Sequence, residues 1–455
     1  MPKFLASVCL VVVLLGGCNG QPSIPQDVKS NIIVRVDKGI TPSIVVGYID
    51  GDSTYYYSYG VKSVETKEPV NEYSVYEIGS ISKTFTAILL ANMAVKGQAK
   101  LNDPVQNYLP PGVTAPTRNG TVIRLVNLSN HTSSLPRMPD NFPSANPANP
   151  FADYSEKMVY EFLNSYQLTR DVNTQYEYSN YAAGLLGLVL STRNGKSYED
   201  FMTDVIARPL GMENTAISLT PNMTKNLAIG HQDEKPVSNW DIISLAGAGG
   251  IRSTTVDMIT YVRANMGITK SELYPAMELT HKNTRGNDAN PLVGLGWHIT
   301  KSDAGEIVWH NGGTGGYRTF AGFIKNGSKG AVVMTNSVVS IDDIGMHLLN
   351  PKAPLVDPDP PKIEEVEVST KILETYVGKY ELMKDFVLTV TLEGNQLNVQ
   401  ATAQPKFPVF AKSENVFFYK VVQAQLTFNK NSKGEIESVT LFQNGQQVNG
   451  KRMKE

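Results

Sequence analysis

The stretch YEIGSISKTFTAILL, residues 76–90, places Ser80, Ser82 and Lys83 at the start of an apolar segment with helical spacing. On a helix, a residue three positions further along lies one turn away on the same face, so the Lys83 amine can reach the Ser80 hydroxyl. Ser82 lacks such a partner, because residue 85 is Phe. A serine hydroxyl becomes a good nucleophile when a base removes its proton, and burial can lower the pKa of a lysine enough for it to be that base. The pattern predicts Ser80 as a nucleophile and Lys83 as its base, although the same spacing taken alone also fits an ordinary solvated helix start.

The composition indicates a folded protein without a strong charge preference. The chain has 455 residues, 41% of them hydrophobic, which is enough for more than one domain. A net charge of −2 gives no general attraction to nucleic acid. Both cysteines, Cys9 and Cys18, lie at the N-terminus, which excludes cysteine catalysis, disulfides and thiolate metal sites in the rest of the chain. The histidines show no metal-ligand spacing with carboxylates, so we expect no metal and no other cofactor.

The N-terminus has the pattern of a secretory signal. Residues 1–18 contain one lysine and an apolar run that is too short for a convincing membrane span. Leu15-Gly16-Gly17-Cys18 resembles the bacterial lipobox, in which the cysteine becomes the lipidated first residue, although a plain signal peptide or an uncleaved anchor stays possible. We therefore expect a periplasmic lipoprotein of the bacterial cell envelope. Asn19 after the cysteine is not the aspartate that often retains lipoproteins at the inner membrane, so the resemblance favours the outer membrane, and the inner membrane stays open as an alternative. Residues 19–38 are predicted to be a tether.

The remainder of the chain divides into two domains. Residues 39–350 begin with a hairpin, continue with mostly helical segments and end with strand-like segments such as EIVWHNGG and GAVVMTN. Residues 351–367 are rich in proline, which continues neither a helix nor a central strand, and are predicted to be a linker. Residues 368–455 alternate in the manner of a barrel-like all-β domain and contain no catalytic cluster.

Two further segments carry residues suited to catalysis. Tyr178-Ser179-Asn180 puts a phenol and an amide at a turn before a helix. His310-Asn311-Gly312-Gly313 puts an imidazole on a strand that then becomes rich in glycine. Taken singly, Tyr178 could be an ordinary half-buried aromatic residue and His310 a structural histidine. Only folding could bring either segment close to Ser80.

Together the three segments resemble the motif set of the penicillin-recognising serine enzymes. That set consists of Ser-x-x-Lys, Tyr-x-Asn, and Lys-Thr-Gly or its His-x-Gly variant. Further stretches at 101–110, 125–136, 208–215 and 247–258 are similar to the class C β-lactamase-related family. Within it, the run from 108 to 137 is similar to the periplasmic class C-like DD-carboxypeptidase/endopeptidase group. The resemblance covers residues 35–350.

The resemblance implies an α/β fold in which an antiparallel sheet is flanked by helices and an all-helical subdomain, with the active site between them. It also implies that Ser80 is acylated, that Lys83 shuttles its proton and that Tyr178 relays a proton to the leaving group. Asn180 would hydrogen-bond the substrate amide and help to hold Lys83. The residues implied to form the rest of the substrate site are His310, Asn311 and Gly312.

Two backbone N–H groups, those of Ser80 and Gly313, are implied to form the oxyanion hole. His131 lies in a segment similar to a His-Thr-Ser-Gly-Leu-Pro motif of the family, with Ser134 in place of the glycine, and is expected to shape the rim. His310 stands where the family more often has lysine. A neutral imidazole attracts a substrate carboxylate less than an ammonium does, which argues against efficient β-lactamase action.

The substrates implied are peptides ending in D-alanine and the β-lactams that mimic them. A carboxylesterase or a D-amino-acid amidase would use the same residues, so both stay open as alternatives. A binding protein that has kept the fold without catalysis is a second alternative. Ser80, Lys83 and Tyr178 are all present, which argues against it.

Overall fold

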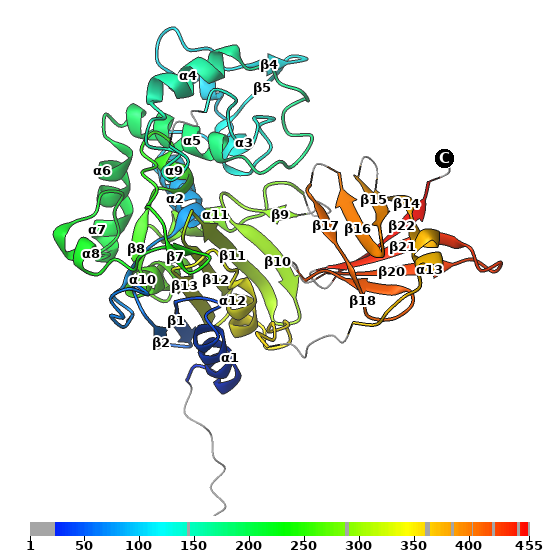
Figure 1. Ribbon diagram of the computed structural model, residues 1–455. Helices are drawn as coiled ribbons and strands as arrows, with labels where there is room; N and C mark the ends of the chain where they lie inside the picture. The colour runs from blue at the N-terminus through cyan, green and yellow to red at the C-terminus, as the bar shows by residue number, and fades with distance from the viewer. Residues whose placement is uncertain are drawn as a thin grey trace, which may run out of the picture. The chain divides into compact units, whose positions relative to one another are not determined.

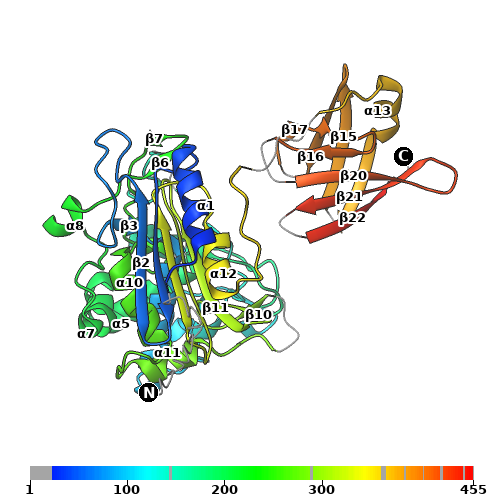
Figure 2. The same cartoon turned by 90° about the horizontal axis from the view of Figure 1, so that it is seen from below.

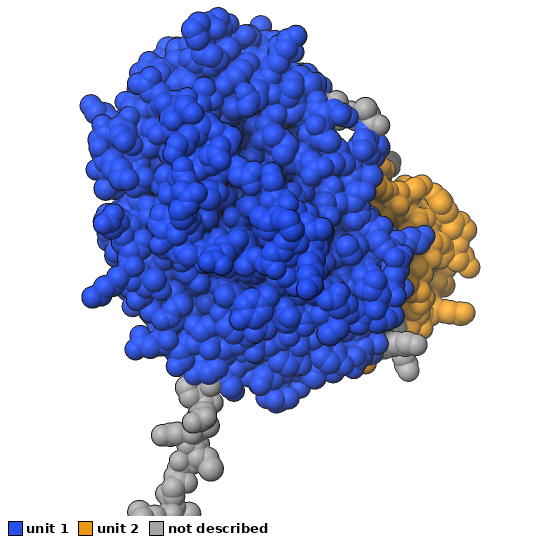
Figure 3. All heavy atoms as spheres, turned by 90° about the vertical axis from the view of Figure 1, so that its left-hand side faces the viewer, with its two compact units in different colours: residues 1–358 blue, residues 359–455 orange. Residues whose placement is uncertain are grey.

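The computed structural model describes residues 23–142, 146–286, 291–359, 365–383, 386–402, 404–420, 424–443 and 446–453. The chain divides into two compact units, residues 1–358 and 359–455, which Figure 3 colours separately. This boundary falls within the predicted linker. The predicted signal peptide and Cys18 lie outside the described residues. No helix in the described ranges is long and apolar enough to cross a membrane.

The first unit is built on a seven-stranded sheet in which neighbouring strands are antiparallel. The order is β2-β1-β13-β12-β11-β10-β9, so the two strands from the start of the chain pair with strands from the end of the domain (Figure 1). The strands are β1 (Ser43–Asp50), β2 (Ser53–Gly60), β9 (Leu292–Val293), β10 (His298–Ser302), β11 (Gly305–Gly313), β12 (Arg318–Ile324) and β13 (Lys329–Thr335). The predicted antiparallel sheet is confirmed.

Helices α1 (Gln26–Asp37) and α12 (Asp342–Leu349) cover one face of this sheet, as Figure 2 shows. Successive strand residues point to opposite faces, so Ile44 and Val46 pack in the core beneath these helices, whereas Val45 belongs to the core on the other face. The prediction of a tether over residues 19–38 is wrong for the part that forms α1. Val28 and Ile32 of this helix are fully buried against the sheet.

The other face carries the helical part of the domain. The longer helices there are α2 (Ser82–Val95), α4 (Glu156–Ser165), α5 (Asn180–Arg193), α10 (Thr255–Asn265) and α11 (Tyr274–Thr280). Every residue of α2 from Ser82 to Met93 is buried, which is the pattern of a helix enclosed on all sides. Figure 1 places α3, α4 and α5 together at one end of the unit, beyond α2, which agrees with the predicted helical subdomain.

Short elements complete the first unit. Three two-stranded sheets pair β3 with β8, β4 with β5, and β6 with β7. The bounds of the short elements are β3 (Val75–Glu77), β4 (Thr117–Arg118), β5 (Thr121–Val122), β6 (His231–Gln232), β7 (Lys235–Pro236), β8 (Arg252–Thr254), α3 (Leu125–Ser129), α6 (Tyr198–Met202), α7 (Arg208–Leu210), α8 (Pro221–Lys225) and α9 (Ala246–Gly249).

In its described residues the second unit is a nine-stranded antiparallel sheet with one short helix, and the predicted all-β domain is confirmed. Its strand order is β17-β16-β15-β14-β22-β21-β20-β19-β18. The core contains Tyr376, Leu388, Leu426 and Phe428, each fully buried or nearly so. The elements are α13 (Thr370–Tyr376), β14 (Gly378–Met383), β15 (Phe386–Glu393), β16 (Gln396–Ala401), β17 (Lys406–Pro408), β18 (Phe410–Ala411), β19 (Val416–Phe418), β20 (Ala424–Lys430), β21 (Ile436–Gln443) and β22 (Gln446–Arg452).

Candidate active site

Ser80 lies in a single 3₁₀ turn, Gly79–Ile81, between β3 and the first residue of α2. The residue before this turn is held from two sides. The Ile78 N–H donates to the Ile251 carbonyl at 3.0 Å, and the Thr319 hydroxyl of β12 donates to the Ile78 carbonyl at 2.9 Å. The Ser82 hydroxyl accepts from the Ile251 N–H at 3.2 Å, so this serine stabilises the turn.

Glycine brings the turn against the end of β11. Gly79 has a φ of 51°, in the left-handed region that side chains disfavour, and a Cβ there would lie 2.6 Å from the Gly313 nitrogen. A Cβ on Gly312 would lie 2.0 Å from the Ile78 carbonyl oxygen. The backbones of the Ser80 turn and of β11 are thus close enough to contact one bound atom group, such as a carbonyl, at the same time.

Lys83 makes three polar contacts through Nζ. The distances are 2.9 Å to Ser80 Oγ, 2.9 Å to Asn180 Oδ1 and 2.6 Å to the Ala248 carbonyl oxygen. Asn180 is the first residue of α5 and Ala248 lies in α9, so the Ser80 turn and two separate helices bring their groups to the amine. Only 2% of Lys83 is exposed.

These contacts suit a neutral amine whose nitrogen lone pair faces the Ser80 hydroxyl. Burial lowers the pKa of Lys83 well below its usual value, and the positive charge of Arg137 lowers it further. A neutral amine has two N–H donors, and both Asn180 Oδ1 and the Ala248 carbonyl can only accept. The lone pair is then left for the Ser80 hydroxyl, which donates to Nζ. This arrangement can remove the serine proton.

Tyr178 lies over the same pair of residues. Its ring centroid is 4.9 Å from Lys83 Nζ, and its hydroxyl is hydrogen-bonded to Ser80. Burial raises the pKa of Tyr178, whereas the hydrogen bond to Ser80 and the charge of Arg137 act in the opposite direction. The phenol is therefore a proton donor at neutral pH.

The loop before α5 holds Tyr178 in position. The Ser179 hydroxyl caps α5 by accepting from the Ala182 N–H and also donates to the Pro136 carbonyl at 2.6 Å. The Ser179 N–H donates to Nδ1 of His131 at 3.2 Å, and the rings of His131 and Tyr178 lie 4.5 Å apart. Only 2% of His131 is exposed, so the expectation that it shapes the rim is wrong. It supports the Tyr178 segment from inside.

His310 points into the site from β11 and is 1% exposed. Its Nδ1–H donates to the Asn311 carbonyl at 2.5 Å, which leaves Nε2 as an acceptor without a partner in the described part of the chain. Its ring lies 6.1 Å from that of Tyr178 and 4.8 Å from that of His298. Burial holds the pKa of His310 well below its usual value, and the charges of His298 and Lys83 add to this effect. The imidazole is therefore neutral.

Asn311 faces away from His310, because successive residues of a strand point to opposite faces. Its amide donates to Asp342 Oδ2 of α12 at 2.6 Å. Burial raises the pKa of Asp342, while the hydrogen bond from Asn311 lowers it. The Asn311 side chain, expected to bind substrate, is thus engaged with α12.

Sequence reasoning missed two contributors to this site. The Ala248 carbonyl accepts from Lys83, but a backbone carbonyl leaves no signature in the sequence. Arg137 lies with its guanidinium carbon 5.1 Å from the Tyr178 ring centroid. Its position directly after the motif-like segment that ends at Pro136 was the signal that could have found it.

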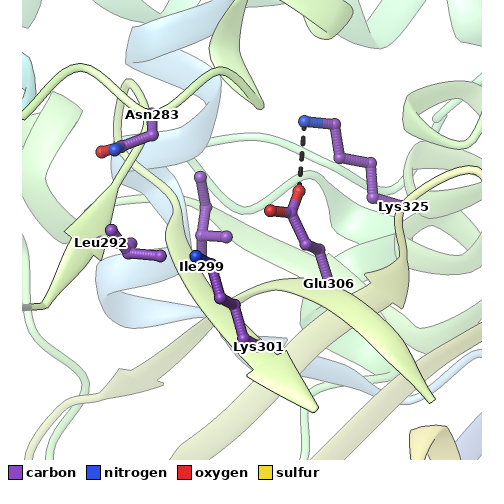
Figure 4. Close-up of a pocket in the computed structure, with 6 residues that line it drawn as sticks. All are labelled: Asn283, Leu292, Ile299, Lys301, Glu306 and Lys325. Carbon is purple, nitrogen blue, oxygen red and sulfur yellow. Dashed lines mark hydrogen bonds and ion pairs between the residues drawn. The ribbon is translucent and has the colours of Figure 1, made fainter. Parts of the chain in front are cut away.

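A hollow of about 440 Å³, lined by Asn127, Asn130 and Thr284 among others, lies elsewhere among the described residues. Among them, no group of three or more His, Cys, Asp or Glu side chains could hold a metal ion. A hollow of about 100 Å³ between β9, β10 and β11 contains the pair of Lys325 and Glu306, 3.5 Å apart, and none of the residues discussed above (Figure 4).

Comparison with known proteins gives matches to both units. Residues 28–348 match the family described as Beta-lactamase, and residues 362–452 match the family described as Domain of unknown function (DUF3471). The D-alanyl-D-alanine-carboxypeptidase/endopeptidase AmpH of Escherichia coli (strain K12) is 32% identical over 340 residues, which are 70% of this chain and 86% of AmpH. A penicillin-binding protein of Bacillus subtilis (strain 168) is 26% identical over 433 residues, which are 89% of this chain and 93% of that protein.

The solved structures agree with this grouping. A β-lactamase/D-alanine carboxypeptidase from Yersinia pestis, complexed with citrate, is similar with a TM-score of 0.64 at 25% identity and covers 72% of this chain and 97% of its own. A class C β-lactamase has a TM-score of 0.63 at 22% identity over 72% of this chain and 96% of its own, which is a likeness of fold alone. The resemblance drawn from the motifs is confirmed: the chain belongs to the β-lactamase family, as a class C-like serine hydrolase.

Proposed function

We propose that the protein hydrolyses amide or ester bonds through an acyl-enzyme on Ser80. The observation that supports this most strongly is the environment of Lys83 Nζ, where two fixed acceptors use its N–H groups and the third contact is Ser80 Oγ. In the first step, the lone pair of Lys83 takes the Ser80 proton while Oγ bonds to the substrate carbonyl carbon. The carbonyl oxygen then carries a negative charge.

Two backbone donors are proposed to stabilise that charge, the N–H groups of Ser80 and Gly313. The close approach of Gly79 to the Gly313 nitrogen supports this role, because it aligns the two segments side by side. When the tetrahedral intermediate breaks down, Tyr178 gives its proton to the leaving nitrogen or oxygen and recovers one from Lys83. A water molecule then attacks the acyl group by the reverse sequence of proton transfers, and Ser80 regains its hydrogen.

The other predicted residues are proposed to bind and orient the substrate. Asn180 keeps its Oδ1 on Lys83, which leaves its amide N–H₂ for a carbonyl of the substrate. His310 offers a neutral acceptor, Nε2, from the strand on which the substrate would lie. Gly312 lets a substrate backbone approach β11 closely.

The substrate class that fits best is a peptide ending in D-alanine, together with the β-lactams that resemble it. This choice is supported by the activities for which AmpH and the Yersinia pestis enzyme are named, and by the motif-like segments similar to the DD-peptidase group. A neutral His310 favours a peptidase with weak β-lactamase action over an efficient β-lactamase. The same machinery would serve an esterase or a D-amino-acid amidase.

A panel of substrates tests this function. Purified protein is assayed with a D-alanyl-D-alanine peptide, nitrocefin, a nitrophenyl ester and a D-amino-acid amide, next to Ser80→Ala. We expect turnover of the peptide, abolished in the variant. Turnover of the ester or the amide alone would move the assignment to esterase or amidase. No turnover of any substrate by a folded protein would favour a binding protein that has kept the fold.

We further propose that Cys18 is lipidated and anchors the protein in the cell envelope. The support is the segment Leu15-Gly16-Gly17-Cys18 after a short apolar run. Growth with an alkyne-tagged fatty acid should label the full-length protein, and Cys18→Ser should abolish the label. Equal labelling of both would exclude this anchor.

A further inference from the structure

Arg137 presents an exposed positive charge beside the catalytic residues. Its guanidinium carbon lies 5.1 Å from the centroid of the Tyr178 ring. The hydroxyl of Tyr178 is hydrogen-bonded to Ser80. The side chain is exposed, and it forms no hydrogen bond and no ion pair with any residue that the structure describes. A guanidinium left free at the mouth of a site is available to a ligand.

The backbone of Arg137 is fixed although its side chain is free. Its carbonyl accepts from the N–H groups of Asn180 at 3.0 Å and Tyr181 at 3.3 Å, at the start of α5. Asn180 also binds Lys83. The start of α5 therefore contacts both the backbone of Arg137 and the amine of Lys83.

The neighbouring charged groups are already neutral or compensated. Arg170 forms an ion pair with Glu177, the acidic residue next to Tyr178 in the sequence. Arg285 stacks on Tyr176 and donates to the Pro291 carbonyl at 2.6 Å.

Two further groups near β11 are likewise accounted for. Arg318 donates to the Thr314 and Tyr317 carbonyls and has Asp342 near it. His310 is neutral because of its burial. Arg137 therefore stands out as an uncompensated charge.

We propose that Arg137 binds a carboxylate of the substrate, so that the enzyme selects negatively charged peptides over neutral esters. This inference rests on the proposed function, because it takes Ser80 as the site of acyl transfer. A planar guanidinium binds a carboxylate through two parallel N–H···O bonds, which fixes orientation as well as charge. An extended peptide advances about 3.3 Å per residue, so a carboxylate within a few residues of the scissile bond can reach Arg137.

Four matched thioesters test the proposal. Each is an N-acyl-D-alanyl thioester, with either glutaryl or glutaramoyl on the amine and either thioglycolate or thioglycolamide as the leaving group. The pairs differ only in a carboxylate or a carboxamide on each side of the reacting carbonyl. The released thiol gives kcat and KM for wild type, Arg137→Gln, Arg137→Lys and a control, Arg193→Gln. Arg193 is exposed at the other end of α5, about 20 Å from its first residue, so its loss changes net charge without touching the site.

We expect wild type to prefer the carboxylate in at least one pair. Arg137→Gln should lower that preference about tenfold, mainly through KM, and Arg137→Lys should keep part of it. Arg193→Gln should leave it unchanged. Arg137 also acts on Lys83 and Tyr178, but that effect is common to all four substrates and cancels in the ratio.

Two results would overturn the proposal while leaving the proposed function intact. One is an equal loss for all four thioesters in Arg137→Gln, and the other is an unchanged preference in both pairs. A different pair of results would refute the proposed function, and the inference with it. These are that wild type shows no Ser80-dependent hydrolysis of any of the four thioesters, and that a fluorophosphonate does not label Ser80.

Discussion

Replacing Asn180 by aspartate tests whether Lys83 acts as a neutral base. The side chain keeps its shape, and the new carboxylate takes the place of the Oδ1 atom that lies 2.9 Å from Lys83 Nζ. Two unit charges at that distance attract each other by about 6 kcal/mol at an effective dielectric constant of about 20, and by about half as much where relaxation and solvent intervene. Even the lower value raises the pKa of Lys83 by about two units.

The protonated form of Lys83 then persists to higher pH, and this form cannot accept the Ser80 proton. We expect the acid limb of kcat/KM against pH to move up by about two units in Asn180→Asp. Below both acid limbs the variant should be about 100-fold slower than wild type, and it should regain rate as the pH rises through its own limb. The profile is measured between pH 5 and 10 with the best substrate of the panel.

Asn180→Ala is the matched control, because it removes the acceptor without adding a charge. It should lower the rate without moving the acid limb upward. A loss of rate in Asn180→Asp that is the same at every pH would refute the reasoning, since the protonation state of Lys83 would then not control acylation.

Three further changes test the geometry. Gly79→Ala places a Cβ 2.6 Å from the Gly313 nitrogen, so kcat should fall at least about 100-fold; activity near wild type would contradict the proposed oxyanion hole. Arg35→Ala removes the partner of Asp343 in the nearly buried ion pair between α1 and α12, and urea unfolding should show a loss of about 3 kcal/mol; a loss below about 0.5 kcal/mol would show that α1 adds little to the domain. Because burial keeps His310 neutral, His310→Gln should lower the rate but leave the acid limb of the pH profile in place, and a displaced limb would mean that His310 titrates during turnover.

The fold of the first unit was predictable where local patterns are strong. The Asp50-Gly51-Asp52 turn between two β-rich segments indicated the hairpin of β1 and β2, and the apolar segment after Ser80 indicated α2. Helix α1 was not predicted, because its buried stripe is short. It contains two apolar residues, Val28 and Ile32, and two polar ones, Asn31 and Arg35, and the burial of Arg35 depends on Asp343 far along the chain.

In the second unit, too, only segments with a strong local pattern could be predicted. Strands β14, β15, β16, β20 and β21 alternate clearly, and they were predicted, but the seven-residue strand β22 was not. The strands β17 and β18 were not predicted, since two or three residues carry too little periodicity, and neither was the seven-residue helix α13, which is only about two turns long.

The residues of the candidate site that could be predicted were those identified by motif spacing and by the order of the motifs. Ser-x-x-Lys placed Lys83 one turn from Ser80, and the Tyr-x-Asn segment supplied Asn180 for the amine. The period of two along a strand already implied that Asn311 points away from His310, and applying it would have corrected the expectation for Asn311. The role of the Ala248 carbonyl depends on the tertiary fold alone.

The central claim is that Ser80 becomes acylated, and intact-mass spectrometry with peptide mapping tests it most directly. Protein is incubated with a fluorescent penicillin and separately with a fluorophosphonate, next to Ser80→Ala and Ser82→Ala. We expect an adduct on the peptide containing Ser80, lost in Ser80→Ala and kept in Ser82→Ala, because the Ser82 hydroxyl is occupied by the Ile251 N–H. An adduct that survives Ser80→Ala, or a folded protein that reacts with neither reagent, would contradict the account.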